Sequence, residues 1–231
     1  MDYVTIGANE ERALPATVEA RASRRPGPEI ANAITHGAGA LLAIAGLVLL
    51  VLRAAAAGDS WYVLSYAIFG ASAIFLYLSS GLYHALSFTK ARKVFEILDH
   101  AAIFVLIAGT YTAFSLTLLR SSSGWWVFGT VWGIAAVGIT LEALFLNRKP
   151  VLTLLAYLVM GWLIVAVWKD LSAAAPAATL AFIIAGGIAY TAGTVFYALG
   201  KRRPWFHPAW HLFVLAGTTC HFFAALAALP A

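Results

Sequence analysis

Seven long apolar stretches constrain the fold of this chain more than any other feature of its sequence. An α-helix needs about 20 predominantly apolar residues to cross a bilayer core of about 30 Å. The stretches that meet this requirement cover residues 33–54, 61–86, 95–119, 124–145, 150–169, 176–199 and 207–229. Short connections separate them. We therefore predict an all-α integral membrane protein with seven transmembrane helices.

The composition of the chain excludes an ordinary soluble domain. Of its 231 residues, 62% are hydrophobic and 11% are charged, whereas soluble domains carry about 25% charged residues. Residues 1–30 are polar and lack the apolar core of a secretory signal peptide. We therefore expect a disordered arm over residues 1–30, followed by a seven-helix transmembrane domain over residues 31–231.

The positive charges near the ends of the predicted helices indicate how the chain crosses the membrane. Cytoplasmic loops are enriched in Lys and Arg. Most of these residues fall in the arm and in alternate loops, namely Arg12, Arg21, Arg24, Arg25, Lys90, Arg92, Lys93, Arg148, Lys149, Lys201, Arg202 and Arg203. The other loops carry only Arg53, Arg120 and Lys169. We predict a cytoplasmic N-terminus, an external C-terminus and a multi-pass location in the inner (plasma) membrane.

The net charge of +5 comes mainly from this asymmetry. It suggests contact with the anionic lipid headgroups of the cytoplasmic leaflet. No nucleic-acid-binding motif is visible in the sequence, so nucleic acid is not an expected partner.

Five ionisable side chains fall near the cytoplasmic ends of the predicted helices, although they are scattered along the chain. They are His36, His84, Asp99, His207 and His211. Ionisable groups inside a membrane are costly and commonly mark a functional site. We therefore expect these groups to form one cluster just below the cytoplasmic surface.

The spacing within this cluster favours a metal site. Residues four positions apart share a helix face, so His207 and His211 can bind one ion, and His84 can supply a third ligand. Catalytic zinc sites have three protein ligands and an open position for water. Asp99 could hold that water and accept its proton. Ser80, one turn before His84, could orient a ligand or donate a hydrogen bond to an oxyanion. The alternative is a polar cluster that contacts water between the headgroups.

The other polar residues of the spans receive structural interpretations. We expect His36 to support the cluster from the first helix and His221 to be a hydrogen-bonded core residue. His100 points about 100° away from its neighbour Asp99 around the helix, so we expect it to be structural or to support the site. Glu142 is expected to extend to interfacial water.

Four motifs resemble those of the hemolysin III family, the bacterial branch of the progestin and adipoQ receptor family, which includes the adiponectin receptors and is related to the alkaline ceramidases. The motifs are EIANAITHGAG, SSGLYHA, LDHAAIFVLIAGTYT and HPAWHLFVLAGTTCHF, in this order. In the receptor branch, the histidines of two such motifs bind zinc and the aspartate contacts a zinc-bound water. The resemblance implies the same roles for His84, His207, His211 and Asp99, with Ser80 as the motif serine.

We weigh three functions on this basis. The preferred one is a zinc-dependent hydrolase of membrane lipid amides or esters, as ascribed to the receptor and ceramidase relatives, which would modulate membrane lipid composition. In that scheme Asp99 accepts a proton from water and returns it to the leaving amine. The family name suggests a pore-forming cytolysin instead, and the third function is a membrane receptor or regulator with structural zinc. Zn²⁺ is the expected cofactor, and membrane lipids are the expected substrate or ligand.

Overall fold

The structure is a computed structural model that describes residues 26–145, 150–200 and 202–230. Seven helical segments in this part of the chain are long and apolar enough to cross a membrane. This confirms the predicted all-α architecture. Residues 1–25, which make up most of the predicted arm, lie outside the described residues.

Six of the seven spans are single α-helices. They are α2 (Pro26–Ala57), α3 (Ser60–Ala85), α4 (Arg92–Ser115), α5 (Gly124–Phe145), α8 (Ala177–Gly200) and α9 (Phe206–Ala227). The remaining span consists of α6 (Pro150–Gly161), a 3₁₀ helix η1 (Trp162–Val167) and α7 (Trp168–Ala174).

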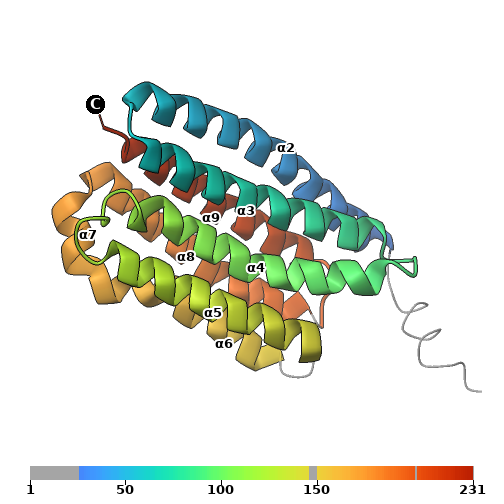
Figure 1. The fold of residues 1–231 in the computed structure, drawn as a ribbon. Helices are drawn as coiled ribbons and strands as arrows, with labels where there is room; N and C mark the ends of the chain where they lie inside the picture. Colours follow the sequence, from blue (N-terminus) through green and yellow to red (C-terminus); the bar gives the residue numbers. More distant parts are fainter. Residues whose placement is uncertain (1–25, 146–149, 201, 231) are drawn as a thin grey trace, which may run out of the picture.

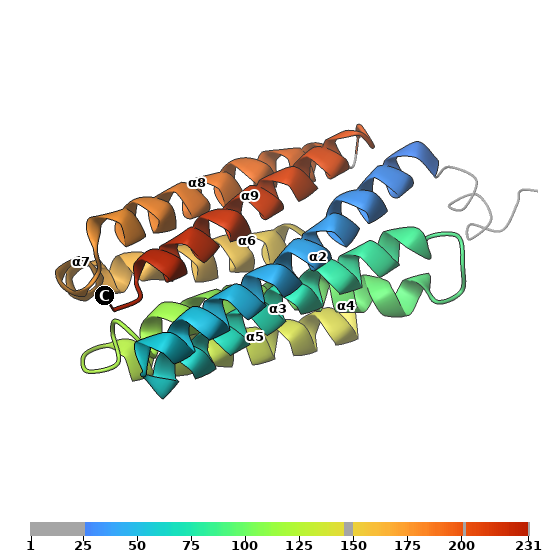
Figure 2. The same cartoon turned by 90° about the horizontal axis from the view of Figure 1, so that it is seen from above.

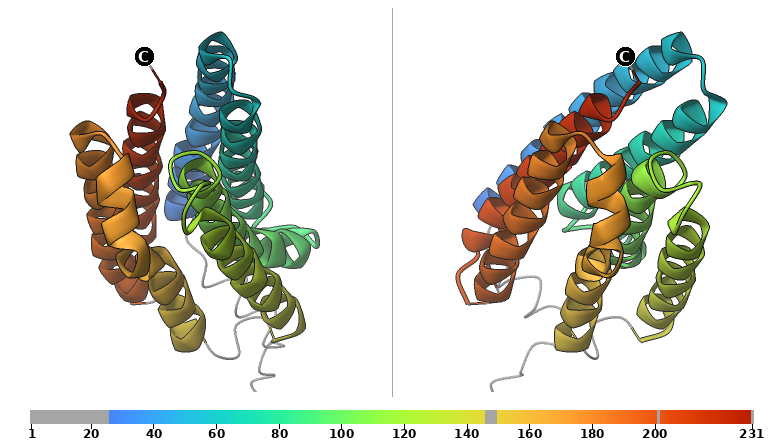
Figure 3. Two further views of the ribbon diagram at one scale, coloured as in Figure 1. Left: turned by 60° about the vertical axis from the view of Figure 1, so that its left-hand side comes forward. Right: turned by 90° about the vertical axis from the view of Figure 1, so that its left-hand side faces the viewer.

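The helices form an elongated bundle in which α2 packs against both α3 and α9 (Figures 1 and 2). Helix α4 packs against α3 and α5, and α8 packs against α9. Figure 3 shows α8 and α9 together with α7 on one side of the bundle, and α2 to α5 on the other. Large apolar side chains such as Leu41, Leu52 and Val159 are exposed on the outside, as expected for a surface that faces lipid.

Helix α2 begins at Pro26 rather than near residue 33, where the apolar stretch begins. Proline fits the first turn of a helix, because the backbone N–H groups there have no intrahelical partner. Glu29, which we had predicted to be part of the polar arm, therefore lies in the first turn of α2. The longer helix carries polar side chains toward α3 and α9.

The fifth span is interrupted, whereas the sequence predicted one continuous helix over residues 150–169. At the interruption, the Tyr111 hydroxyl donates to the carbonyl of Gly161 at 2.8 Å and accepts from the N–H of Ile164 at 2.7 Å. Backbone groups in a membrane must be satisfied inside the protein, and an irregular segment is tolerated where it is buried or borders a cavity. A tyrosine from α4 meets that requirement here.

Close packing between α2 and α3 depends on Gly70. A Cβ atom at this position would lie 2.7 Å from the Cβ atom of Leu47 and 3.1 Å from its Cα atom. Small residues allow membrane helices to approach in this way. The close approach fixes α2 beside α3 and so fixes the α2 side chains that reach the candidate site.

Candidate functional site

Three histidines from two helices meet at the end of the bundle where α2 begins. His84 lies in the last turn of α3, and His207 and His211 lie near the start of α9. One nitrogen atom from each ring lies within 4.8 Å of the other two. The ring centroids are 4.9 to 5.2 Å apart. The fold therefore brings together the three residues that the sequence predicted as metal ligands.

The chemistry of this group fits one metal ion. His84 and His211 are buried, and the Nε2 atom of His84 has no hydrogen-bond partner among the described residues. A buried polar atom without a partner is costly and needs an explanation, such as an ion. Imidazole nitrogens are common zinc ligands, so these three side chains could hold a divalent cation.

Two α2 side chains hold the His84 ring. Its Nδ1 atom lies 2.7 Å from a carboxylate oxygen of Glu29 and 3.3 Å from the amide nitrogen of Asn32. A carboxylate at Nδ1 holds the ring proton on that atom and leaves Nε2 free to bind a metal, the arrangement found around many metal-binding histidines.

Two further α2 side chains hold the His211 ring. The Thr35 hydroxyl lies 3.2 Å from its Nδ1 atom. The buried ring of His36 stacks on it, with centroids 3.6 Å apart and planes inclined by 7°. This contact agrees with the supporting role expected for His36. Helix α2 thus orients two of the three candidate ligands.

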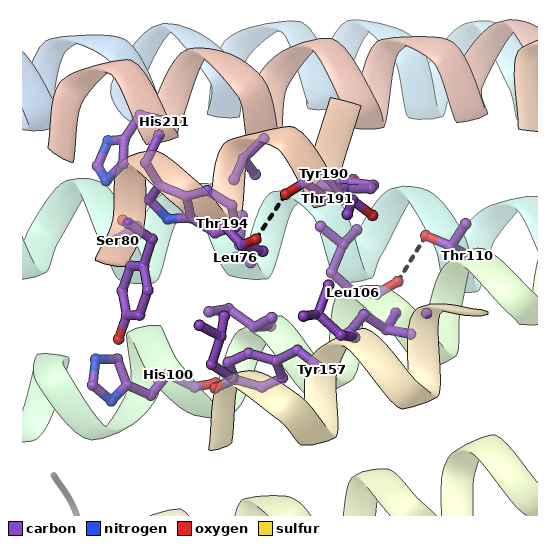
Figure 4. Close-up of a pocket in the computed structure, with 18 of the residues that line it drawn as sticks. Leu76, Ser80, His100, Leu106, Thr110, Tyr157, Tyr190, Thr191, Thr194 and His211 are labelled. Carbon is purple, nitrogen blue, oxygen red and sulfur yellow. Dashed lines mark hydrogen bonds between the residues drawn. The ribbon is translucent and has the colours of Figure 1, made fainter. Parts of the chain in front are cut away.

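A cavity of about 480 Å³ extends from the histidines into the bundle, and most of the residues that line it are apolar or aromatic (Figure 4). Asp99 and Ser80 border this cavity together with the three histidines. Asp99 interacts electrostatically with His84. The Ser80 hydroxyl interacts with the same Asp99 carboxylate. All five predicted site residues therefore line the same cavity.

Glu142 is buried, so the prediction that it extends to interfacial water was wrong. One carboxylate oxygen lies 2.6 Å from Nδ1 of His100, and the other accepts from the Thr153 hydroxyl at 3.2 Å. These partners from α4 and α6 replace the water that an unpaired carboxylate would seek. The sequence does not reveal the pair, because its members lie 42 residues apart on different helices.

The contribution of α2 to the site is the part that sequence analysis missed. It assigned Glu29 to the arm and gave Asn32 and Thr35 no role. A signal was present, because residues 29, 32 and 36 recur at intervals of three and four and so share one helix face. An earlier helix start, suggested by the prolines at 26 and 28, would have revealed that face.

We expect Glu29→Gln to weaken metal binding at this site. Glutamine has a similar size, but its neutral amide is a poorer acceptor for the Nδ1 proton of His84. Loss of such a partner typically lowers metal affinity about 10- to 100-fold. Competition with a zinc indicator dye, measured on detergent-purified protein, determines the change in zinc affinity.

Glu96→Gln provides a matched control. Glu96 also borders the cavity, but its carboxylate pairs with Arg92 at 3.3 Å instead of with a histidine of the group. Equal loss of affinity in the two variants would contradict a specific role for Glu29.

Comparisons with known proteins match almost all of the described chain. The family model described as "Haemolysin-III related" matches residues 26–222. "Hemolysin-3 homolog" from Bacillus subtilis (strain 168) is 46% identical over 198 residues, covering 86% of this chain and 92% of the relative. "Hemolysin-3" from Bacillus cereus is 42% identical over 198 residues, covering 86% and 90%. "Monocyte to macrophage differentiation factor" from Homo sapiens is 28% identical over 203 residues, covering 84% and 81%.

Proposed function

The chain belongs to the haemolysin-III related family, and from this premise we propose that it is a zinc-dependent hydrolase of membrane lipid amides or esters. It is a multi-pass integral membrane protein of the plasma membrane. The observation that carries the proposal is the group of His84, His207 and His211 at one end of a largely apolar cavity. Three protein ligands leave a coordination position open, which is typical of catalytic zinc sites.

The residues around the cavity supply the parts of a hydrolytic mechanism. His84, His207 and His211 would hold the zinc ion, which supplies a Lewis acid that polarises a carbonyl group and acidifies water. The carboxylate of Asp99 would accept a proton from the attacking water. The hydroxyl of Ser80, which lies beside Asp99, would donate a hydrogen bond to the substrate oxygen as negative charge develops there. The leaving nitrogen or oxygen then needs a proton, which Asp99 could return.

The shape and lining of the cavity support a lipid substrate. Its volume of about 480 Å³ lies within the range of about 300–1,000 Å³ found for ligand pockets. An acyl chain could lie along its apolar walls with the carbonyl group at the histidines. Helix α6 packs only lightly against α4 and α8, so a chain could enter from the lipid beside α6.

Lysis of membranes is the second candidate function, and the name of the Bacillus cereus relative, "Hemolysin-3", favours it. A cytolysin must reach and permeabilise a foreign bilayer. A chain with seven apolar spans has little surface suited to water, because lipid-facing helices are apolar on the outside. We therefore prefer the hydrolase to the cytolysin.

Removal of the metal tests the proposed activity. We expect detergent-purified protein to release fatty acid from ceramides or related lipids, to lose this activity when a chelator removes zinc, and to regain it when zinc is returned. Mass spectrometry of the released fatty acid measures the turnover. Zinc-loaded protein that releases none would reject the hydrolase, and dye release from liposomes that is insensitive to chelation would favour the cytolysin.

A further inference from the structure

A partly buried acid–base pair lies outside the three-histidine group, and one of its members, His100, borders the cavity. Nδ1 of His100 on α4 lies 2.6 Å from the carboxylate of Glu142 on α5, and the two side chains are 16% and 6% exposed. Ionisable groups within a membrane are costly and by default suggest a function. A buried ion pair is also weak evidence for stability, since apolar residues of similar size often stabilise as well. The pair therefore calls for a chemical explanation.

His100 occupies a useful position relative to the proposed substrate. It lies at the same end of the cavity as His211 and Ser80, on the opposite wall (Figure 4). It also follows Asp99 directly in α4, and both side chains border the cavity. A carbonyl group held near the three histidines would therefore have His100 across the cavity from it.

The surroundings of His100 fix both its ring and its backbone. The ring contacts Glu142, whose second oxygen accepts from the Thr153 hydroxyl at 3.2 Å. The Tyr157 hydroxyl donates to the His100 carbonyl at 2.9 Å. A carboxylate at Nδ1 orients an imidazole and stabilises its protonated form. Nε2 is then the nitrogen that can exchange a proton with a molecule in the cavity.

We propose that His100 is the catalytic acid that protonates the leaving group, and that Glu142 is its positioning residue. The inference rests on the proposed hydrolase function. It assigns the protonation of the leaving group to His100 in place of Asp99. The water oxygen bonds to the carbonyl carbon while Asp99 takes the water proton. The carbon–nitrogen bond then breaks, its electron pair stays on nitrogen, and Nε2 of His100 gives that nitrogen a proton. Transfer of the proton from Asp99 to His100 restores both residues.

The test compares a poor leaving group with a good one. The amine of a ceramide must be protonated to leave, whereas the p-nitrophenolate of p-nitrophenyl palmitate leaves without a proton at neutral pH. In His100→Asn, the amide can still donate to Glu142. We expect ceramide hydrolysis to fall about 10²- to 10⁴-fold, the usual contribution of a general acid. The zinc content and the hydrolysis of the p-nitrophenyl ester should change little.

Two further variants separate a chemical role from a structural one. Glu142→Gln should show the same selective loss on ceramide, because it keeps the shape of the positioning residue but removes its charge. His221→Gln changes a second histidine that borders the same cavity and should leave the ratio of the two rates unchanged.

The outcomes distinguish failure of this proposal from failure of the hydrolase function on which it rests. An equal fall on both substrates in His100→Asn, or an unchanged rate on ceramide, would overturn the role of His100 and leave the hydrolase intact. Wild-type protein that turns over neither substrate would reject the hydrolase, and the proposal with it.

Discussion

Replacing either His207 or His211 with alanine is expected to reduce the zinc content of the purified protein from about one ion per chain to almost none. Each variant would leave only two of the three protein ligands that such a zinc site uses. The two side chains are four positions apart on α9, and each offers a nitrogen within 4.8 Å of those of the other two histidines. The ring of His36 stacks flat on His211, and His36 is not part of the group of three. Elemental analysis of detergent-purified protein measures the zinc content.

His221→Gln is the matched control for these variants. His221 is buried on the same helix, but it is not part of the three-histidine group, so its replacement should leave the zinc content unchanged. Full zinc content in either alanine variant would remove the proposed site. Freshly prepared wild-type protein without zinc would instead support a polar cluster at the membrane interface and remove the basis of the hydrolase.

Replacing Asp99 with asparagine is expected to leave the zinc content intact and to reduce lipid hydrolysis about 10²- to 10⁴-fold, the range typical of a lost general base. Asparagine has nearly the same shape but cannot accept the proton of the attacking water. Asp99 borders the cavity beside the histidines, whereas the candidate ligand set consists of histidines alone. Parallel measurements of zinc content and fatty-acid release test both halves of this expectation.

Glu96→Gln again serves as the comparison, because Glu96 lies on the same helix, borders the same cavity and pairs with Arg92. It should retain both zinc and most of the turnover. Retained turnover in Asp99→Asn would refute the role of Asp99 as base. Loss of zinc from that variant would show that Asp99 acts on the metal instead of on water.

The spans could be predicted because hydrophobicity is a local property of the sequence. The stretch over residues 124–145 matches α5, which covers Gly124–Phe145. The ends were less accurate where polar residues continue a helix, as in α2, which starts at Pro26. The interruption between Gly161 and Trp168 could not be predicted, because the Tyr111 hydroxyl that satisfies its backbone comes from another helix.

The candidate ligands could be predicted for a related reason. In a bundle of membrane helices, the order of the spans fixes the depth of each residue, so His84, His207 and His211 could be assigned to one level before any packing was known. The spacing of His207 and His211 also fixed their common face. Depth and face were sufficient to group these three histidines.

What the sequence alone determined about this protein is therefore the number of spans, the depth of the ionisable residues and the family motifs, all of which follow from hydrophobicity and spacing along the chain. Only the tertiary structure decided which side chains are partners across helices. It joined Glu29 to His84, stacked His36 on His211 and paired His100 with Glu142. The physical reason is that depth follows from chain order, whereas the rotation of each helix and its choice of neighbours depend on packing among all of them.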